Sequence, residues 1–128
     1  MISKLWGEST SILCCLNFEI HRIAVKRNGY SSMHIHKYKY NAIYVESGLL
    51  YVFVPNLYTR KYELSAGQSV IIPPECRHRF IAMDETIAFE YYWVGIDRSV
   101  LEYPIDDIVR EDVGGVFSDA EILQYSCS

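Results

Sequence analysis

The sequence predicts an all-β domain, and two repeated patterns carry that prediction. Short segments rich in valine, isoleucine and aromatic residues recur about every 8–12 residues, the spacing of strands in sandwiches and barrels. Turn-forming pairs such as Asn28-Gly29, Ser47-Gly48 and Pro73-Pro74 separate these segments. An antiparallel barrel or sandwich is therefore the expected architecture.

The individual strands follow from the same pattern. Expected strands cover residues 11–20, 21–26, 42–46, 49–54, 69–72, 78–82 and 86–94. No long segment has helical periodicity, and the best helix candidate is the short stretch 118–125. There Ser118 is a suitable N-cap, and Glu121 follows it at the spacing of a capping box. The chain is thus expected to end in a short extension after the barrel.

Length and charge indicate one domain without a nucleic-acid partner. The 128 residues suit a single domain, 1–128, that buries its own core. The formal net charge is only −4, and lysine and arginine form no basic stripe of the kind that neutralises phosphates. No apolar run reaches the roughly 18 residues of a membrane span, and the first residues lack the order of a signal peptide. We therefore expect a cytoplasmic protein that does not enter a membrane.

Cysteine spacing indicates reduced thiols. The four cysteines are Cys14, Cys15, Cys76 and Cys127, and no pair has the C-x-x-C spacing of a redox or zinc motif. A cytoplasmic chain with this pattern is not expected to form disulfides.

Three histidines suggest a metal site. His34 and His36 are two residues apart, so on a strand their side chains share one face. His78 follows an apolar strand and a proline-containing turn, and it is the best candidate for a third ligand. Three imidazoles suffice for zinc in some enzymes, and they also suit iron, nickel or copper. The alternative is a pair of solvated histidines on a strand edge.

These stretches resemble the paired motifs of the cupin superfamily. In residues 29–48, His34, His36 and Gly48 fit the first motif; in residues 67–82, Gly67, Pro73 and His78 fit the second. The resemblance implies a double-stranded β-helix, an antiparallel jelly-roll barrel with the metal inside it. The chain departs from the first motif at Asn41, which stands where that motif has a glutamate ligand, and in the spacer after Gly29, which is one residue short. It departs from the second motif at Glu75, where glycine is usual, and at Ala82, where asparagine is common.

A narrower resemblance covers most of the chain. Lys4, Trp6 and Gly7 look like the opening of mannose-6-phosphate isomerase domains of the cupin type, and SVIIPPECRHRF is similar to one of their internal stretches. Residues 103–112, YPIDDIVRED, resemble the tail of those domains. The guanylyltransferase to which such domains are often fused has no counterpart here. The resemblance implies a metal-dependent sugar-phosphate isomerase.

Two further residues are candidates for the chemistry. Asn41 would be an optional fourth ligand of the metal, or a hydrogen-bond partner for a histidine or a substrate hydroxyl. Glu90 lies in an apolar strand in which alternation places Ala88, Glu90 and Tyr92 on one face. Because burying an unpaired carboxylate is costly, Glu90 is a candidate general base or a replacement for the missing glutamate.

The expected substrate pocket is aromatic. Tyr38, Tyr40 and Tyr44, together with Cys76, are candidates to line it, although ordinary strand packing explains tyrosines equally well. His21 lies outside both motifs and is expected to be structural. Strand alternation directs a further set of four basic side chains away from the histidines, unless a bulge intervenes: Lys37, Lys39, Arg77 and Arg79.

Three functions remain open at this stage. The first is a metal-dependent isomerase that moves a proton between adjacent carbons, with zinc expected first and manganese, iron or nickel as alternatives. The second is a cupin that binds a sugar or sugar phosphate without turnover, and the third is an oxygen-using metal enzyme. A homodimer is also expected, because the N-terminal strand with Ile12, Leu13, Leu16 and Phe18 is an apolar edge.

Overall fold

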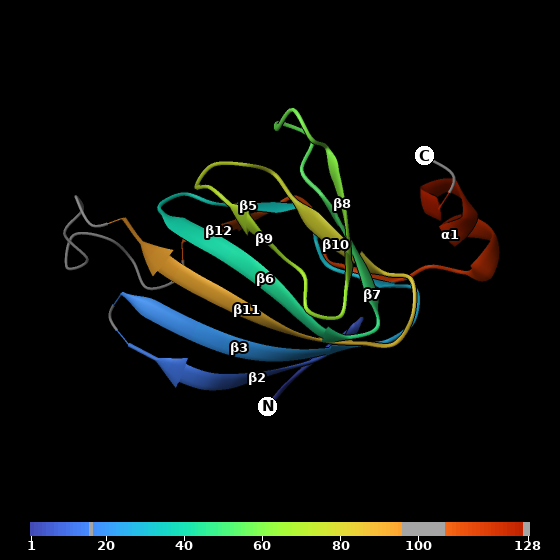
Figure 1. The fold of residues 1–128 in the computed structure, drawn as a ribbon, viewed down its shortest axis with the longest axis horizontal. Coiled ribbons are helices and arrows are strands. Elements are labelled where there is room, and N and C mark those ends of the chain that lie inside the picture. Colours follow the sequence, from blue (N-terminus) through green and yellow to red (C-terminus); the bar gives the residue numbers. More distant parts are fainter. Residues whose placement is uncertain (16, 96–106, 127–128) are drawn as a thin grey trace.

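A computed structural model of the chain shows two antiparallel sheets that face one another, with one helix at the periphery (Figure 1). The structure describes residues 1–15, 17–95 and 107–126. Every strand pairing in it is antiparallel, as the turn-punctuated pattern predicts. The expected all-β jelly-roll with a short C-terminal extension is therefore confirmed.

The larger sheet has the strand order β1-β2-β3-β11-β6-β9. Its strands are β1 (Ile2–Lys4), β2 (Gly7–Cys14), β3 (Phe18–Val25), β11 (Thr86–Val94), β6 (Lys39–Ser47) and β9 (Ser69–Ile72). The second sheet has the order β13-β4-β10-β7-β8. Its strands are β13 (Gly115–Val116), β4 (Gly29–Tyr30), β10 (Arg79–Ala82), β7 (Leu49–Phe53) and β8 (Lys61–Ser65).

A third, two-stranded sheet is made of β5 (His34–His36) and β12 (Ile108–Arg110). It joins the first histidine motif to a segment near the C-terminus, with Ile108 opposite His36 and Arg110 opposite His34. His34 also forms an isolated bridge with His78, in which each backbone N–H donates to the other residue's carbonyl. These pairings bring three distant parts of the sequence together.

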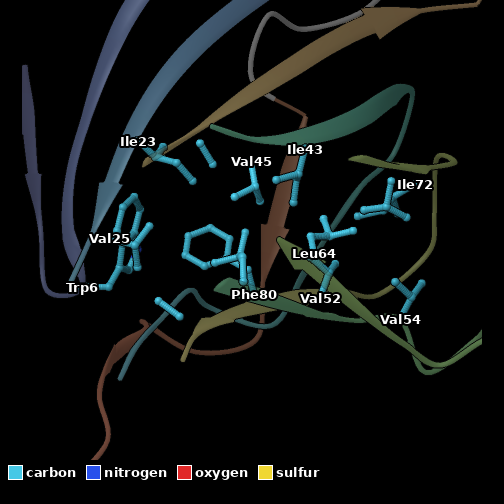
Figure 2. Packing of buried hydrophobic residues seen from close by; sticks show 14 residues of the cluster. Trp6, Ile23, Val25, Ile43, Val45, Val52, Val54, Leu64, Ile72 and Phe80 are labelled. Carbon is cyan, nitrogen blue, oxygen red and sulfur yellow. The ribbon is translucent and has the colours of Figure 1, made fainter. Parts of the chain in front are cut away.

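The hydrophobic core lies between the two main sheets (Figure 2). Inward-facing side chains such as Ile23, Ile43 and Val52 are completely buried, and Trp6 meets Phe80 edge-on with ring centroids 5.1 Å apart. Burial of each such aliphatic side chain contributes about 1.5–3 kcal/mol. This packed layer fills one end of the barrel and holds the strands that carry the polar site at the other.

The N-terminal strands differ from the prediction. The expected break between residues 20 and 21 does not exist, because β3 runs through it and the turn comes earlier, where the Cys15 N–H donates to the Phe18 carbonyl at 2.8 Å. The apolar β2 is also not the sheet edge, since β1 pairs outside it. Leu16 and Cys127 lie outside the described residues, as do residues 103–106 of the tail motif.

The C-terminal helix α1 (Asp119–Ser126) is confirmed with its capping box. The Glu121 N–H donates to Ser118 Oγ at 3.1 Å, and the Ser118 N–H donates to the Glu121 carboxylate at 2.9 Å. Ile122 is the buried residue of this short helix. Among the described residues, no helix has the length and hydrophobicity that crossing a membrane requires.

Candidate metal centre and adjoining cavity

Three buried histidines converge at the polar end of the barrel. His34 and His36 point from the same face of β5, and His78 enters from the turn before β10. Their candidate ligand atoms all lie within 4.8 Å of one another, and the residues the structure describes contain no other such group. The structure therefore brings together the two halves of the predicted metal site.

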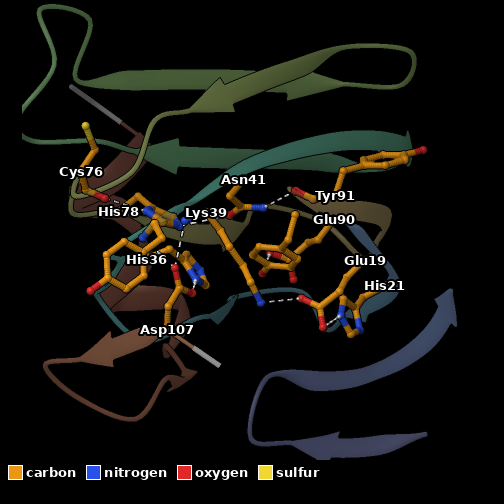
Figure 3. A network of polar contacts seen from close by, with 12 residues as sticks. Glu19, His21, His36, Lys39, Asn41, Cys76, His78, Glu90, Tyr91 and Asp107 are labelled. Carbon is orange, nitrogen blue, oxygen red and sulfur yellow. Dashed lines mark hydrogen bonds and ion pairs between the residues drawn. The ribbon is translucent and has the colours of Figure 1, made fainter. Parts of the chain in front are cut away.

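Each of these imidazoles has an oxygen next to its Nδ1 atom. His34 Nδ1 lies 2.8 Å from the Ser32 carbonyl, and His78 Nδ1 lies 2.9 Å from the Cys76 carbonyl. His36 Nδ1 lies 3.1 Å from Oδ1 of Asp107 (Figure 3). Carbonyls and carboxylates only accept hydrogen bonds, so these contacts favour a proton on Nδ1 and a lone pair on Nε2 in each neutral ring. For His78, the 2.9 Å contact of Nδ1 is shorter than the 3.2 Å contact of Nε2 with Asn41 Oδ1.

The Nε2 atoms are the natural ligands of a metal ion. His36 Nε2 is buried and has no hydrogen-bond partner, which is costly for a polar atom unless something else satisfies it. Metal-bound histidines usually donate the other ring N–H to a carbonyl or carboxylate, and all three rings here do so. The residues therefore fit a divalent metal on donor chemistry and on burial.

Burial keeps two of these rings neutral. It is the largest of the causes that lower the pKa of His34 to about 2, and the neighbouring His78 and His36 make the next largest contributions. Burial likewise lowers the pKa of His78 to about 4, against the opposing effect of the Cys76 carbonyl. Neutral imidazole is the form that coordinates a metal, so the site is ready for an ion at physiological pH.

Asn41 sits beside the cluster in the position of the missing glutamate. Its Oδ1 lies 3.2 Å from His78 Nε2, and its Nδ2 donates to the carbonyls of Ala42 and Tyr91, each at 3.3 Å. The two donated bonds fix which end of the amide faces the histidine. Asn41 is almost completely buried, so this oxygen is the fourth donor available at the centre.

A cavity of about 400 Å³ adjoins the histidines. His34 and His36 form part of its wall, and Trp6 and Phe80 form an apolar part. Ile2 and Ile108 add to this apolar part, and the wall also contains a set of polar and charged side chains: Lys4, Glu19, His21, Lys39, Glu90, Tyr92, Asp107 and Arg110. Such a mixture suits a ligand with several hydroxyl or charged groups.

Glu90 points into this cavity from β11, on the face that alternation predicts. Its carboxylate accepts a hydrogen bond from the Tyr92 hydroxyl at 2.7 Å, and Tyr92 in turn contacts the His36 ring with centroids 4.9 Å apart. Burial and the Glu90 charge raise the pKa of Tyr92, which keeps it a hydrogen-bond donor. Glu90 is not part of the ligand cluster itself.

Lys39 lines the cavity, so the expectation that strand alternation directs its side chain away from the histidines is wrong. Bends at Lys37 and Tyr38 interrupt the strand after His36, so the inward positions change from even to odd numbers. Lys39 is consequently buried, lines the cavity and forms an ion pair with Glu19 at 3.0 Å. Arg77 and Arg79 point outward as expected, paired with Glu111 and Asp112 respectively.

The four side chains expected to line the substrate pocket are absent from this cavity wall. Tyr40 stacks on Trp93, and Tyr44 is exposed, because both alternate with the inward residues of β6. Tyr38 lies at the bend, where its N–H donates to Asp107. Cys76 packs against the core, and burial raises the pKa of its thiol.

Several cavity residues escaped the sequence-based prediction, among them His21, Asp107 and Arg110. His21, expected to be structural, lines the cavity and meets the Tyr92 ring edge-on at 5.7 Å. Asp107 and Arg110 come from the tail motif and reach the site through the pairing of β12 with β5. The resemblance of the tail motif to isomerase domains was the sequence signal that could have identified Asp107 and Arg110. The spacing of residues along the chain does not reveal that two such distant segments pair.

Glu75 shows why the second cupin motif usually has glycine at this position. Its φ is +65°, in the left-handed region that glycine adopts without strain. The Glu75 N–H donates to the His36 carbonyl at 2.7 Å, so this turn ties the His78 segment to β5. The left-handed turn therefore forms here with glutamate at this position.

Comparison with family models gives a match to the cupin domain over residues 21–95. The chain belongs to the cupin family. The match begins within β3, spans both histidine motifs and β11, and ends before the tail segment that contributes Asp107 and Arg110.

Solved structures of other cupins share this fold at low sequence identity. KdgF from Halomonas sp. is 15% identical with a TM-score of 0.66, covering 76% of this chain and 86% of its own. A variant of Streptomyces PAC13, solved with uridine, is 15% identical with a TM-score of 0.68, covering 94% of this chain and 87% of its own. Pac13 is a nucleoside dehydratase.

An RmlC-like cupin from Shewanella frigidimarina is 17% identical with a TM-score of 0.63, covering 73% of this chain and 80% of its own. A comparison with curated protein sequences found no match. At these identities, the likeness to other cupins concerns the fold, and function must be argued from the site.

Proposed function

We propose that this cupin binds one divalent metal ion through His34, His36 and His78 and holds a small hydroxylated or phosphorylated ligand in the adjoining cavity. The observation that carries the proposal is the arrangement of the three imidazoles. All three commit Nδ1 to an oxygen acceptor, which leaves three buried Nε2 lone pairs close together. Zinc is the ion we expect first, with manganese, iron or nickel as alternatives.

The catalytic version of this proposal is a sugar-phosphate isomerase of the mannose-6-phosphate type. A bound metal would polarise a substrate carbonyl as a Lewis acid. Glu90 is the proposed general base, taking a proton from the carbon beside the carbonyl and returning it to the neighbouring carbon, while Tyr92 orients its carboxylate. Lys4 and Arg110 are cationic lining residues that suit a phosphate group.

The alternative is a cupin that binds such a ligand without turnover, and Asn41 favours it. A site of three neutral imidazoles and a neutral amide does not offset the charge of a metal ion, whereas the usual glutamate would. PAC13 was solved with uridine on a similar fold, so a nucleoside is another candidate for a hydroxylated ligand.

The metal content of the purified protein tests the first part of the proposal. Elemental analysis of the wild type should find close to one divalent ion per chain, and His34→Ala should abolish it. His21→Ala is the matched control, because His21 lies in the same cavity but outside the ligand cluster. A folded wild type that takes up no zinc, manganese, iron or nickel would refute the metal site.

Turnover separates the two functions. Conversion of mannose 6-phosphate to fructose 6-phosphate by the metal-loaded wild type supports the isomerase, and binding of the sugar phosphate without conversion supports the binding module. A strict iron requirement with oxygen consumption would instead indicate an oxygen-using enzyme.

A homodimer also remains a proposal. In the described part of the chain, β1 is the outer strand of the larger sheet, and it carries the exposed side chain of Ile2, with Leu5 exposed just after it. Such an edge favours pairing with a second copy. Light scattering on the purified protein checks this, and a monomer at all accessible concentrations would contradict it.

A further inference from the structure

The tail motif reaches the metal centre through one carboxylate. Asp107 precedes β12 and lies outside residues 21–95, the part that matches the cupin domain. Its side chain is only 1% exposed. One carboxylate oxygen, Oδ1, lies 3.1 Å from His36 Nδ1. The other, Oδ2, accepts the backbone N–H groups of Tyr38 at 2.8 Å and Lys39 at 2.9 Å.

The three histidines therefore differ in what holds them. His34 and His78 are oriented by backbone carbonyls two residues before each of them, which form part of their own turns. His36 is oriented by a side chain that is 71 residues further along the chain. Its ring orientation depends on whether the tail segment is docked against β5.

We propose that Asp107 is a positioning residue that holds His36 in the Nδ1–H tautomer and so presents its Nε2 atom to the metal. This inference rests on the proposed metal site. A carboxylate has no proton to donate, so the hydrogen bond requires the hydrogen to be on His36 Nδ1. It also increases the basicity of the imidazole as a ligand. The tail is therefore part of the metal centre rather than an appendage of the barrel.

The substitution Asp107→Asn gives a sharp test because the two carboxylate oxygens have different partners. The asparagine carbonyl must take the place of Oδ2, since the two backbone N–H groups need an acceptor. The amide NH₂ then faces His36 Nδ1 and can only donate to it. His36 must move its proton to Nε2, and a protonated Nε2 cannot bind a metal.

The expected results are a change of tautomer and a loss of affinity. Nitrogen-15 NMR of the metal-free protein at about pH 8, where an ordinary histidine is neutral, should show His36 as Nδ1–H in the wild type and Nε2–H in Asp107→Asn. The His36→Gln variant assigns the signal. Zinc affinity, measured by competition with a chelating dye, should fall about 10–100-fold in Asp107→Asn.

Glu111→Gln is the matched control. Glu111 lies in the same tail and pairs with Arg77 at a half-exposed position away from the ligands, so this variant should retain the zinc affinity and His36 tautomer of the wild type. If Asp107→Asn kept both as well, or if wild-type His36 were Nε2–H, the proposal would be overturned. The wild-type NMR measurement decides even where Asp107→Asn does not fold.

The same design separates this proposal from the proposed function. A wild type that has the Nδ1–H tautomer but takes up no zinc refutes the metal site and leaves the hydrogen bond from His36 to Asp107 standing. A wild type that binds zinc, together with an Asp107→Asn variant of unchanged affinity, refutes the positioning role alone.

Discussion

Asn41 Oδ1 and His78 Nε2 lie 3.2 Å apart, and with the His78 proton on Nδ1 both atoms are hydrogen-bond acceptors. The shorter contact of Nδ1, 2.9 Å to the Cys76 carbonyl, favours this tautomer, and the amide of Asn41 is held with its oxygen toward the ring. Two facing acceptors repel each other unless a proton or a cation lies between them. A metal ion shared by the cluster would remove this conflict.

Replacing Asn41 with aspartate should strengthen metal binding. The isosteric carboxylate offsets the charge of the ion, and an added attraction of about 1.4 kcal/mol raises zinc affinity tenfold. Without metal, the same carboxylate faces the carbonyls that Asn41 now donates to, so the metal-free variant should lose about 1–3 kcal/mol of stability. Thermal unfolding with and without zinc measures both effects. Asn41→Ala is the control, and an Asn41→Asp variant with unchanged or weaker zinc binding contradicts the prediction.

The metal-free protein should lose stability in mild acid. The folded-state pKa of His34 is about 2 and that of His78 is about 4, both below the ordinary value of 6.5, so the unfolded chain takes up these protons first. Stability is therefore present above about pH 6.5 and decreases as the pH falls, by about 1.4 kcal/mol per pH unit for each histidine. At about pH 5 the two together should cost roughly 4 kcal/mol.

Urea unfolding of chelator-treated protein between neutral pH and about pH 5 measures this loss. His34→Gln should remove about half of the pH dependence because it removes one of the two buried imidazoles. Asp107 should not contribute in this range. Desolvation raises its pKa, but hydrogen bonds from His36, Tyr38 and Lys39 outweigh it and lower the pKa to about 2. Equal stability at the two ends of the range would contradict the prediction.

Substitutions at Glu90 and Tyr92 should have non-additive effects on the free energy of unfolding, and they should not remove the metal. Tyr92→Phe removes the hydroxyl that donates to the buried Glu90 carboxylate, so it should cost about 1–3 kcal/mol. Glu90→Gln should leave metal content unchanged, because Glu90 lies outside the ligand cluster. If the protein isomerises mannose 6-phosphate, the same variant should lower kcat by about 10²–10⁴-fold.

A double-mutant cycle of Glu90→Gln and Tyr92→Phe isolates the interaction between the two side chains. Additive losses in the cycle would show that the hydrogen bond contributes nothing to folding. Loss of metal in Glu90→Gln would instead make Glu90 part of the metal centre.

Glycine at position 75 should stabilise the protein. Glu75 has a positive φ, which costs a residue with a Cβ atom about 1–2 kcal/mol, while glycine adds some backbone entropy to the unfolded chain. The expected net gain for Glu75→Gly is about 0.5–1 kcal/mol in chemical unfolding. Glu75→Ala is the control that removes the carboxylate but keeps the strain. If both variants were equally stable, the backbone conformation would not be the cause.

Much of the candidate site follows from short-range sequence rules. The two-residue spacing of His34 and His36 places them on one face of a strand, and the same rule correctly turns Glu90 inward from β11. The capping box at Ser118 and Glu121 predicts α1 because it involves residues only three apart. These rules work where a single strand or helix turn decides which side chains are neighbours.

The same rules fail where the backbone changes direction. Alternation counted from His36 directs Lys39 outward, but the bend at residues 37–38 shifts the inward face by one residue. That shift buries Lys39 and turns Tyr40 and Tyr44 away from the cavity. A bend of this kind depends on the contacts that hold it, here the Asp107 carboxylate and two backbone N–H groups.

By itself, the sequence determined that the chain is an all-β cupin and that His34, His36 and His78 are its candidate ligands, since both conclusions depend on patterns within short segments. Only the tertiary structure decided that Asp107 orients His36, that Lys39 and His21 share the cavity, and that Asn41 Oδ1 faces His78. The physical reason is that these contacts join strands far apart along the chain, and burial and hydrogen bonding across the barrel select them.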